Sequence, residues 1–212
     1  MRLRVFTVLV LGALVVGGSA ASASAGVLYN QNGGSPVRAV ISQNFEPKYD
    51  ASDSWLADDF TVPAGHKWRI RRIDVTGEDN TGGVSAPSEN VTFYRDLNGQ
   101  PGAVVNSQTV VGSDHLNGLT ATSTGSYWIA LTGFRLRAGT YWVSVQVNEN
   151  FDPSGDEWHW GISSGSLAGA SAMFQNPGDG YATGCTTWGT IATCNQVTAG
   201  SNLMFDLRGR QI

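Results

Sequence analysis

The sequence predicts an all-β protein, a single-domain antiparallel β-sandwich of jelly-roll type. Side-chain polarity alternates with a period of two residues in most hydrophobic segments, which is the period of a strand with one buried face. The 27 glycines and clusters of Asn and Pro separate these segments, as expected for tight turns. After residue 25, no segment keeps the 3.6-residue period of an amphipathic helix. Roughly ten strands joined by polar turns are typical of two packed sheets.

The clearest strand candidate covers residues 140–147. Its odd-numbered side chains, from Tyr141 to Val147, are apolar and share one face, which we expect to point into the core. Trp142 and its even-numbered neighbours occupy the other face, where they line a groove or cover a second sheet. The remaining candidates are residues 27–30, 37–45, 55–62, 67–76, 91–94, 103–111, 127–131, 157–162, 172–175 and 203–208.

The strand candidate that begins at residue 67 contains a phase change. Trp68 and Ile70 lie on one face of a regular strand, whereas Ile73 and Val75 lie on the opposite face. All four can point into the core only if an extra residue separates the two pairs. We therefore expect a β-bulge at residues 71–72, where two residues of this strand face one residue of its partner.

Asp58 interrupts the apolar face of the strand candidate at residues 55–62. If its alternate apolar neighbours point inward, Asp58 points inward with them. A buried carboxylate needs hydrogen-bond donors, a cationic partner or a metal ion. Backbone N–H groups or an arginine are the preferred partners. Calcium held together with Asp50, Asp53 and Asp59 is the alternative.

Residues 1–25 have the order of a secretory signal peptide. Arg2 and Arg4 give a positive start, an apolar run follows, and small residues at 23–25 suit a cleavage site. The apolar run of about 12 residues is shorter than the roughly 20 that span a hydrocarbon core. We therefore expect a secreted, extracellular protein in which residues 26–212 form one β-sandwich domain, with no membrane contact after cleavage.

The charge balance argues against nucleic acid as a partner. The chain holds 13 Lys and Arg against 17 Asp and Glu, a net charge of −4, and loss of two arginines with the signal peptide lowers it to about −6. Binding to a phosphate backbone relies on clustered Lys and Arg. The basic cluster of Lys67, Arg69, Arg71 and Arg72 belongs to a strand candidate, so we expect it to be divided between two faces.

The two cysteines, Cys185 and Cys194, predict a structural disulfide. An even number of cysteines close together in an exported protein is typical of such a bridge. It would close a loop of about ten residues and stabilise the fold by about 2–3 kcal/mol in the chain-entropy model. The pair offers too few ligands for zinc, since no histidine lies nearby. We expect no cofactor and no metal site.

Three segments together resemble a known group of proteins. They are residues 55–65 (WLADDFTVPAG), residues 91–94 (VTFY) leading to residues 99–102 (GQPG), and residues 138–145 (AGTYWVSV). This framework resembles a group of bacterial exported β-sandwich modules, found alone or attached to larger secreted and cell-surface proteins. The group has no established activity, so the resemblance implies a fold and an extracellular location rather than a chemistry.

Trp158 and Trp160 carry the main functional hypothesis. On a strand they share one face, about 6.6–6.8 Å apart along the chain. Two parallel indoles at this spacing could stack on flat, amphipathic ligands such as sugars, with Asp156 and Glu157 as hydrogen-bond acceptors. Packing of both indoles in the core is the alternative.

We therefore expect a non-catalytic exported module that binds a polysaccharide, a cell-surface glycan or another extracellular surface. Loop residues near the predicted disulfide are added to the candidates because loops often carry binding groups. Two other classes stay open: a structural or adhesive surface protein without a small-molecule site, and a secreted glycoside hydrolase using one of the two acidic candidates. The expected binding residues are Trp158, Trp160, Tyr181, Trp188, Asp156 and Glu157.

Overall fold

The computed structural model of the protein describes residues 25–33, 36–80, 86–111, 114–115, 125–163, 169–198 and 200–212. The predicted signal peptide lies outside this part of the chain, apart from its last residue. The strands are β1 Gly26–Asn30, β2 Pro36–Ile41, β3 Gln43–Asn44, β4 Trp55–Val75, β5 Gly77–Asp79, β6 Ser88–Asp96, β7 Pro101–Val111, β8 Asp114–His115, β9 Tyr127–Asn148, β10 Trp158–Ser163, β11 Met173–Gln175, β12 Gly189–Thr190 and β13 Phe205–Gln211; the helical segments are η1 Pro47–Ser52 and α1 Ile191–Asn195.

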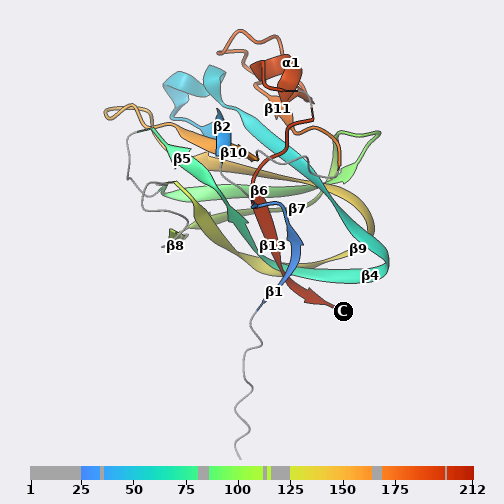
Figure 1. The fold of residues 1–212 in the computed structure, drawn as a ribbon. Helices are drawn as coiled ribbons and strands as arrows, with labels where there is room; N and C mark the ends of the chain where they lie inside the picture. The colour runs from blue at the N-terminus through green and yellow to red at the C-terminus, as the bar shows by residue number, and fades with distance from the viewer. Residues whose placement is uncertain are drawn as a thin grey trace, which may run out of the picture.

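The strands form two packed sheets, which confirms the predicted all-β sandwich (Figure 1). The larger sheet follows the order β1-β13-β4-β9-β6-β7, with β3, β8, β11 and β12 attached beside this path. The smaller sheet follows the order β2-β10-β5. Neighbouring strands of the described residues are antiparallel except β3 and β9, which run in parallel.

Strands β4 and β9 form the backbone of the larger sheet. They have 21 and 22 residues and pair antiparallel along most of their length. Their pairing is interrupted between Val62 and Lys67, where the chain contains Pro63 and Gly65. Gly65 has a φ of +79°, which glycine adopts far more readily than other residues. Both long strands bend at the interruption and together form one end of the sandwich (Figure 1).

The core lies between the two sheets and is rich in aromatic rings. Trp158 and Trp160 project from β10, the middle strand of the smaller sheet, toward the larger sheet. There the ring of Trp158 lies 6.0 Å from that of Tyr127, and the ring of Trp160 lies 6.2 Å from that of Phe205. Burying such large apolar surfaces is the main favourable contribution to the stability of this fold.

Both faces of β9 are buried between Tyr141 and Val147. The odd-numbered side chains lie in the core, as predicted. Trp142 is also fully buried, and its indole N–H donates to an oxygen of Asp96 at 2.9 Å. A strand that is buried on both faces therefore runs through the middle of the larger sheet, between β4 and β6.

The β-bulge predicted at residues 71–72 is present. On the side of β13, Ile70 and Arg72 of β4 face consecutive residues of the partner, so Arg71 is the extra residue. The insertion shifts the phase of β4, and Trp68 and Ile73 consequently both reach the core. The register with β9 is also interrupted at this point.

The basic residues of β4 are not divided between two faces, and that expectation was wrong. Lys67 and Arg69 alternate with buried neighbours and therefore point outward. A regular strand would have turned Arg72 inward, but the bulge at Arg71 returns it to the outer face. The four cations consequently share the outer side of the sheet.

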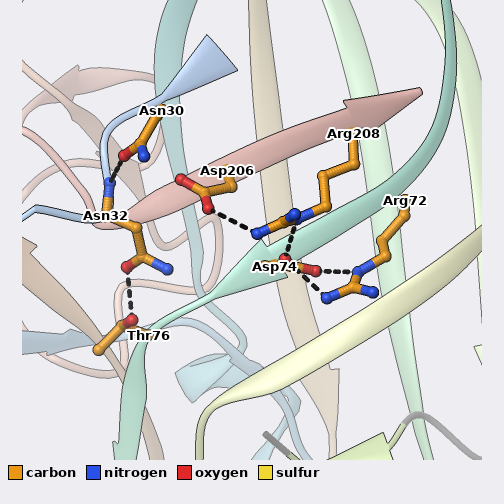
Figure 2. A network of polar contacts seen from close by, with 7 residues as sticks. All are labelled: Asn30, Asn32, Arg72, Asp74, Thr76, Asp206 and Arg208. Carbon is orange, nitrogen blue, oxygen red and sulfur yellow. Dashed lines mark hydrogen bonds and ion pairs between the residues drawn. The ribbon is translucent and has the colours of Figure 1, made fainter. Parts of the chain in front are cut away.

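Beyond the bulge, the outer face carries a network of ion pairs (Figure 2). Arg72 and Arg208 both pair with the carboxylate of Asp74, and Arg208 also lies 3.4 Å from an oxygen of Asp206. The guanidinium of Arg72 covers the ring of Trp128 at 4.7 Å, a cation–π contact. Both arginines beyond the bulge therefore have carboxylate partners.

Asp58 is fully buried and hydrogen-bonded, as predicted. One of its oxygens accepts from the side-chain amide of Gln31 and the N–H of Leu203, each at 2.6 Å, and the other accepts from the N–H of Asp59 at 2.8 Å. Burial raises the pKa of Asp58 well above its ordinary value, and these three donors oppose the shift. Asp58 thus joins β4 to the segments before β2 and before β13.

The predicted disulfide between Cys185 and Cys194 is present. It joins the loop before β12 to α1, and Gly189 lies against both sulfur atoms, where a side chain would collide with Cys194. In the described part of the chain, neither helical segment has the length or hydrophobicity needed to cross a membrane.

Candidate ligand-binding site

Trp158 and Trp160 do not form an exposed stacking platform, which corrects the main functional hypothesis. Both side chains have 0% exposure, and their rings are tilted by 39° rather than parallel. Their indole N–H groups donate to the carbonyls of Gly125 at 2.6 Å and Met204 at 2.8 Å. Trp158 and Trp160 share one face of the strand, as the alternation predicted. That face is the inner face of the smaller sheet, so both indoles are part of the core.

A small hollow brings two of the other predicted residues, Glu157 and Tyr181, together. We call it the aromatic pocket; its volume is about 160 Å³. Its rings pack edge to face, with 5.2 Å between the ring centroids of Tyr49 and Phe151 and an angle of 76° between their planes. The pocket is lined by Phe45, Tyr49, Ser52, Phe151, Glu157 and Tyr181.

The loop of residues 176–181 places Tyr181 against η1. Asn176 donates to the carbonyl of Ala51 at 2.7 Å and accepts from the N–H of Tyr181 at 3.1 Å. The contact is so close that a Cβ on Gly178 or Gly180 would lie 2.5 or 2.6 Å from backbone atoms of Ala51. Only glycine fits at these two positions, and this wall of the pocket is therefore held by backbone packing.

The hydroxyl of Tyr181 is a polar group of the aromatic pocket whose hydrogen bonding is incomplete. Its oxygen is buried, yet it makes no hydrogen bond to any described residue. Burial raises the pKa of the Tyr181 hydroxyl, and the negative charges of Glu157 and Asp53 raise it further. The hydroxyl is therefore neutral at physiological pH and can both donate and accept a hydrogen bond. Leaving such a group unsatisfied costs about 1–3 kcal/mol.

Glu157 supplies an acceptor at the same pocket. Its backbone N–H donates to the side chain of Asn80 at 2.9 Å, which orients the residue. One carboxylate oxygen receives a long hydrogen bond of 3.4 Å from the amide of Asn80. An ionised carboxylate accepts several hydrogen bonds, so Glu157 retains capacity for a ligand hydroxyl.

Asp156 faces a different hollow, so the two acidic candidates are separated. This acidic pocket has a volume of about 350 Å³ and shares Phe45 with the aromatic pocket. Asp156 is buried, and its carboxylate accepts from the hydroxyl of Ser154 at 2.6 Å. Glu149 also lines the acidic pocket and is only 5% exposed.

Glu149 makes the stability of the fold dependent on pH. Burial raises the pKa of Glu149 to about 8, and the charges of Asp79 and Asp156 contribute to the shift. In the unfolded chain this group has the ordinary glutamate pKa of 4.5. Between these two values the unfolded chain releases the proton and the folded protein keeps it, so stability is lost as the pH rises.

We therefore expect Glu149→Gln to be more stable than the wild type by about 4 kcal/mol at pH 8 and by less than about 1 kcal/mol at pH 5. Urea denaturation at both pH values measures this difference. The exposed Glu78 is the matched control, and Glu78→Gln should follow the wild type at both pH values. A constant difference between Glu149→Gln and the wild type across this range would show that Glu149 does not titrate as described.

Trp188 lies away from the aromatic pocket, on the outer face of the larger sheet. Its ring contacts that of Tyr94 edge to face, with 6.0 Å between centroids. Nearby on the same face, Asp59 lies beside Trp142 in the register of β4 and β9. Burial raises the pKa of Asp59, and the N–H of Ala170 opposes this by donating to it at 2.9 Å. The expected grouping of Trp188 with Tyr181 is not found.

The aspartates considered for calcium have other partners. Asp53 accepts from the N–H of Phe45 at 2.8 Å, while Asp58 and Asp59 accept backbone N–H groups. Asp50 is exposed on η1. Within the described ranges, no three His, Cys, Asp or Glu side chains come together in a way that could hold a metal ion.

Four residues of the aromatic pocket were missing from the sequence-based candidates: Phe45, Tyr49, Ser52 and Phe151. The three aromatic residues lie within two residues of Pro47 or Pro153, which is the local signal that could have selected them. Their meeting depends on Glu46, whose carboxylate accepts from the N–H groups of Phe151 at 2.8 Å and Asp152 at 3.2 Å. This long-range contact leaves no periodic pattern in the sequence.

Similar folds are found among solved structures of Cwp84. No protein-family model matches the chain, and no curated protein sequence matches it. A structure described as a clostridial cysteine protease, Cwp84, after propeptide cleavage has a TM-score of 0.51 at 12% identity, covering 84% of this chain and 38% of that chain. A second, described as the cysteine protease and lectin-like domains of Cwp84, a surface layer associated protein of Clostridium difficile, has a TM-score of 0.47 at 11% identity, covering 73% and 31%. The chain thus spans less than two fifths of either structure, and the likeness is one of fold.

Proposed function

We propose that this protein is an extracellular, non-catalytic β-sandwich module that binds carbohydrate at the aromatic pocket. The observation that carries the proposal is that Tyr181, whose hydroxyl has no hydrogen-bond partner among the described residues, lines one pocket together with Glu157 and three aromatic rings. A sugar hydroxyl can satisfy both groups, and the rings of Tyr49 and Phe151 offer apolar contact to its carbon atoms.

The size and surroundings of the pocket support a single sugar unit as the bound element. Its volume of about 160 Å³ is below the range typical of larger organic ligands. The acidic pocket, which shares Phe45 as a lining residue, offers further polar contacts for a neighbouring unit. Asp156 and Glu157 face different hollows, so they do not flank one ligand as a catalytic carboxylate pair must.

The extracellular location rests on the signal-peptide pattern of residues 1–25 and on the resemblance to exported modules. The fold shared with Cwp84 is compatible with such a role but extends only to the architecture.

Tyr181→Phe tests the proposed site because it removes only the unpaired hydroxyl. If that hydroxyl has no ligand, its removal leaves stability unchanged or slightly higher. If it binds sugar, affinity falls about tenfold, because each lost hydrogen bond is worth about 1 kcal/mol or more. The ligand is first selected on a glycan array with residues 26–212, and its affinity for wild type and variant is then measured by isothermal titration calorimetry.

The control is Tyr94→Phe on the outer sheet face, which should bind the selected glycan like the wild type. Glu157→Gln should also weaken binding, since it replaces a carboxylate acceptor of the same pocket. The proposal fails if no glycan binds at millimolar concentration, or if Tyr181→Phe and Glu157→Gln both bind as tightly as the wild type.

A further inference from the structure

One outer surface of the larger sheet concentrates positive charge in an otherwise acidic chain. We call it the basic face, and it lies where β4, β9 and β13 pair near the C-terminus (Figure 1). It holds six of the 13 basic residues of the chain, a large share of the positive charge of a molecule whose net charge is −4. Its members are Lys67, Arg69, Arg71, Arg135, Arg137 and Arg210.

The sheet register places these cations directly opposite one another. Arg69 on β4 faces Arg135 on β9 and also faces Arg210 on β13. Lys67 faces Arg137 in the next row. Residues directly opposite in an antiparallel pair project from the same side of the sheet, with Cβ atoms about 5 Å apart. The cations therefore form rows that cross three strands.

The segments that build the face supply no acidic side chain to compensate this charge. Residues 60–73, 126–148 and 207–212, which build the face, contain no Asp or Glu. Among the described residues, none of the six cations forms an ion pair, whereas Arg72 and Arg208 beyond the bulge are paired (Figure 2). Repulsion from Arg71, together with desolvation and repulsion from Arg210 and Arg135, lowers the pKa of Arg69 below its ordinary value.

This arrangement opposes folding, because like charges directly opposite in a sheet are destabilising. A row of cations without counter-charges concentrates anionic ligands at the surface and accelerates their binding. The chain contains 17 acidic residues but places none of them on this face. Uncompensated repulsion is expected where a ligand supplies the missing negative charge, since functional sites commonly retain features that lower stability.

The geometry favours a flat, multivalent anion. Adjacent strands lie about 4.8 Å apart and alternate residues about 6.8 Å apart, so the cations form a grid of about 10 by 14 Å. A small anion would contact only one or two of them, whereas a linear polymer can contact several. Within the segments that build the face, Ile212 is the single exposed large hydrophobic residue, which is too little apolar surface for insertion into a lipid layer.

We propose that the basic face binds a linear polysaccharide that bears carboxylate or phosphate groups. Arginine suits this task, because its planar guanidinium forms paired hydrogen bonds with both kinds of anion. The choice of polysaccharide over nucleic acid rests on the proposed extracellular role. The basic face shares no residue with the aromatic pocket, so the two sites can be tested separately.

The test compares Arg135→Gln/Arg137→Gln with wild type for binding to polygalacturonate at 50 and 200 mM NaCl. The matched control, Arg38→Gln/Arg95→Gln, removes the same charge from exposed positions elsewhere. We expect the first variant to lose at least about tenfold in affinity at 50 mM NaCl and to show a weaker salt dependence. Its Tm should stay constant or rise by about 1–4 °C, because repulsion is relieved. The control should change affinity less than about twofold.

The other outcomes contradict the proposal. Equal binding by wild type and Arg135→Gln/Arg137→Gln, or an equal loss in the control, would show that the face is not the site. Binding of a DNA duplex or of phosphatidylglycerol vesicles without binding of polygalacturonate would assign the face to another class of partner. Salt-sensitive self-association in the absence of polysaccharide would assign it to a second copy of the chain. The Tyr181→Phe experiment is independent, so failure at one site is distinguishable from failure at the other.

Discussion

Trp160→Ala is expected to lower the free energy of unfolding by about 3–5 kcal/mol. The side chain is fully buried between the sheets, and its indole N–H donates to the carbonyl of Met204. Truncation removes the packing against Phe205 and leaves a cavity that the surrounding strands fill only in part. Guanidinium denaturation at neutral pH measures the loss as a lower midpoint at an unchanged slope.

The matched control is Trp188→Ala, because Trp188 is only partly buried and contacts the ring of Tyr94 on the outer sheet face. We expect this variant to lose about 1 kcal/mol. If Trp160→Ala unfolds the protein completely, Trp160→Phe keeps an aromatic ring and should show a smaller loss of the same kind. A Trp160→Ala protein with normal stability and weakened glycan binding would restore the exposed stacking platform and overturn the core assignment.

Asp58→Ala is expected to lower the free energy of unfolding by about 3 kcal/mol or more. The substitution leaves the N–H groups of Leu203 and Asp59 and the amide of Gln31 without the carboxylate that accepts from them. These donors are buried, so water does not replace the lost acceptor without local opening. Asp58→Asn should also destabilise the fold, because the NH₂ group of asparagine cannot accept a hydrogen bond. Asparagine has almost the same volume as aspartate, so this variant measures the loss of the hydrogen bonds without a change in packing.

Asp50→Ala provides the control, since Asp50 is exposed on η1 and should change stability by less than about 0.5 kcal/mol. Native-state hydrogen exchange adds a local readout: Asp58→Ala should accelerate exchange at Leu203 more than at the centre of β9. Equal stability of Asp58→Ala and Asp50→Ala would mean that the buried carboxylate does not join the segments it contacts.

The architecture of the fold could be predicted from local patterns in the sequence. The alternation in residues 140–147 identified the core face of β9, and the broken phase between Ile70 and Ile73 located the bulge at Arg71. Asp58 was recognised because a single carboxylate stood among inward-pointing residues. In each case the information lies within a few residues, since the period of a strand is fixed by backbone geometry.

The site was only partly accessible from the sequence. Glu157 and Tyr181, two of the predicted binding residues, line one hollow, whereas the indoles of Trp158 and Trp160, which were expected to form an exposed platform, belong to the core. The alternation of side-chain polarity shows which residues share a face of a strand, but it does not show which face packs against the other sheet. Phe45 and Phe151 reach the pocket through the long-range contacts of Glu46, for which the sequence has no spacing rule.

The sequence alone determined strand positions, the packed-sheet class, the disulfide and the inward direction of Asp58, because each depends on short-range geometry and on the cost of burying an unpaired polar group. Tertiary structure decided which side of β10 faces the core, which aromatics meet around Tyr181 and that cations from β4, β9 and β13 form one surface. Those features depend on the pairing of strands that lie far apart in the chain, and that pairing is set by the free energy of burying the whole core rather than by any one segment.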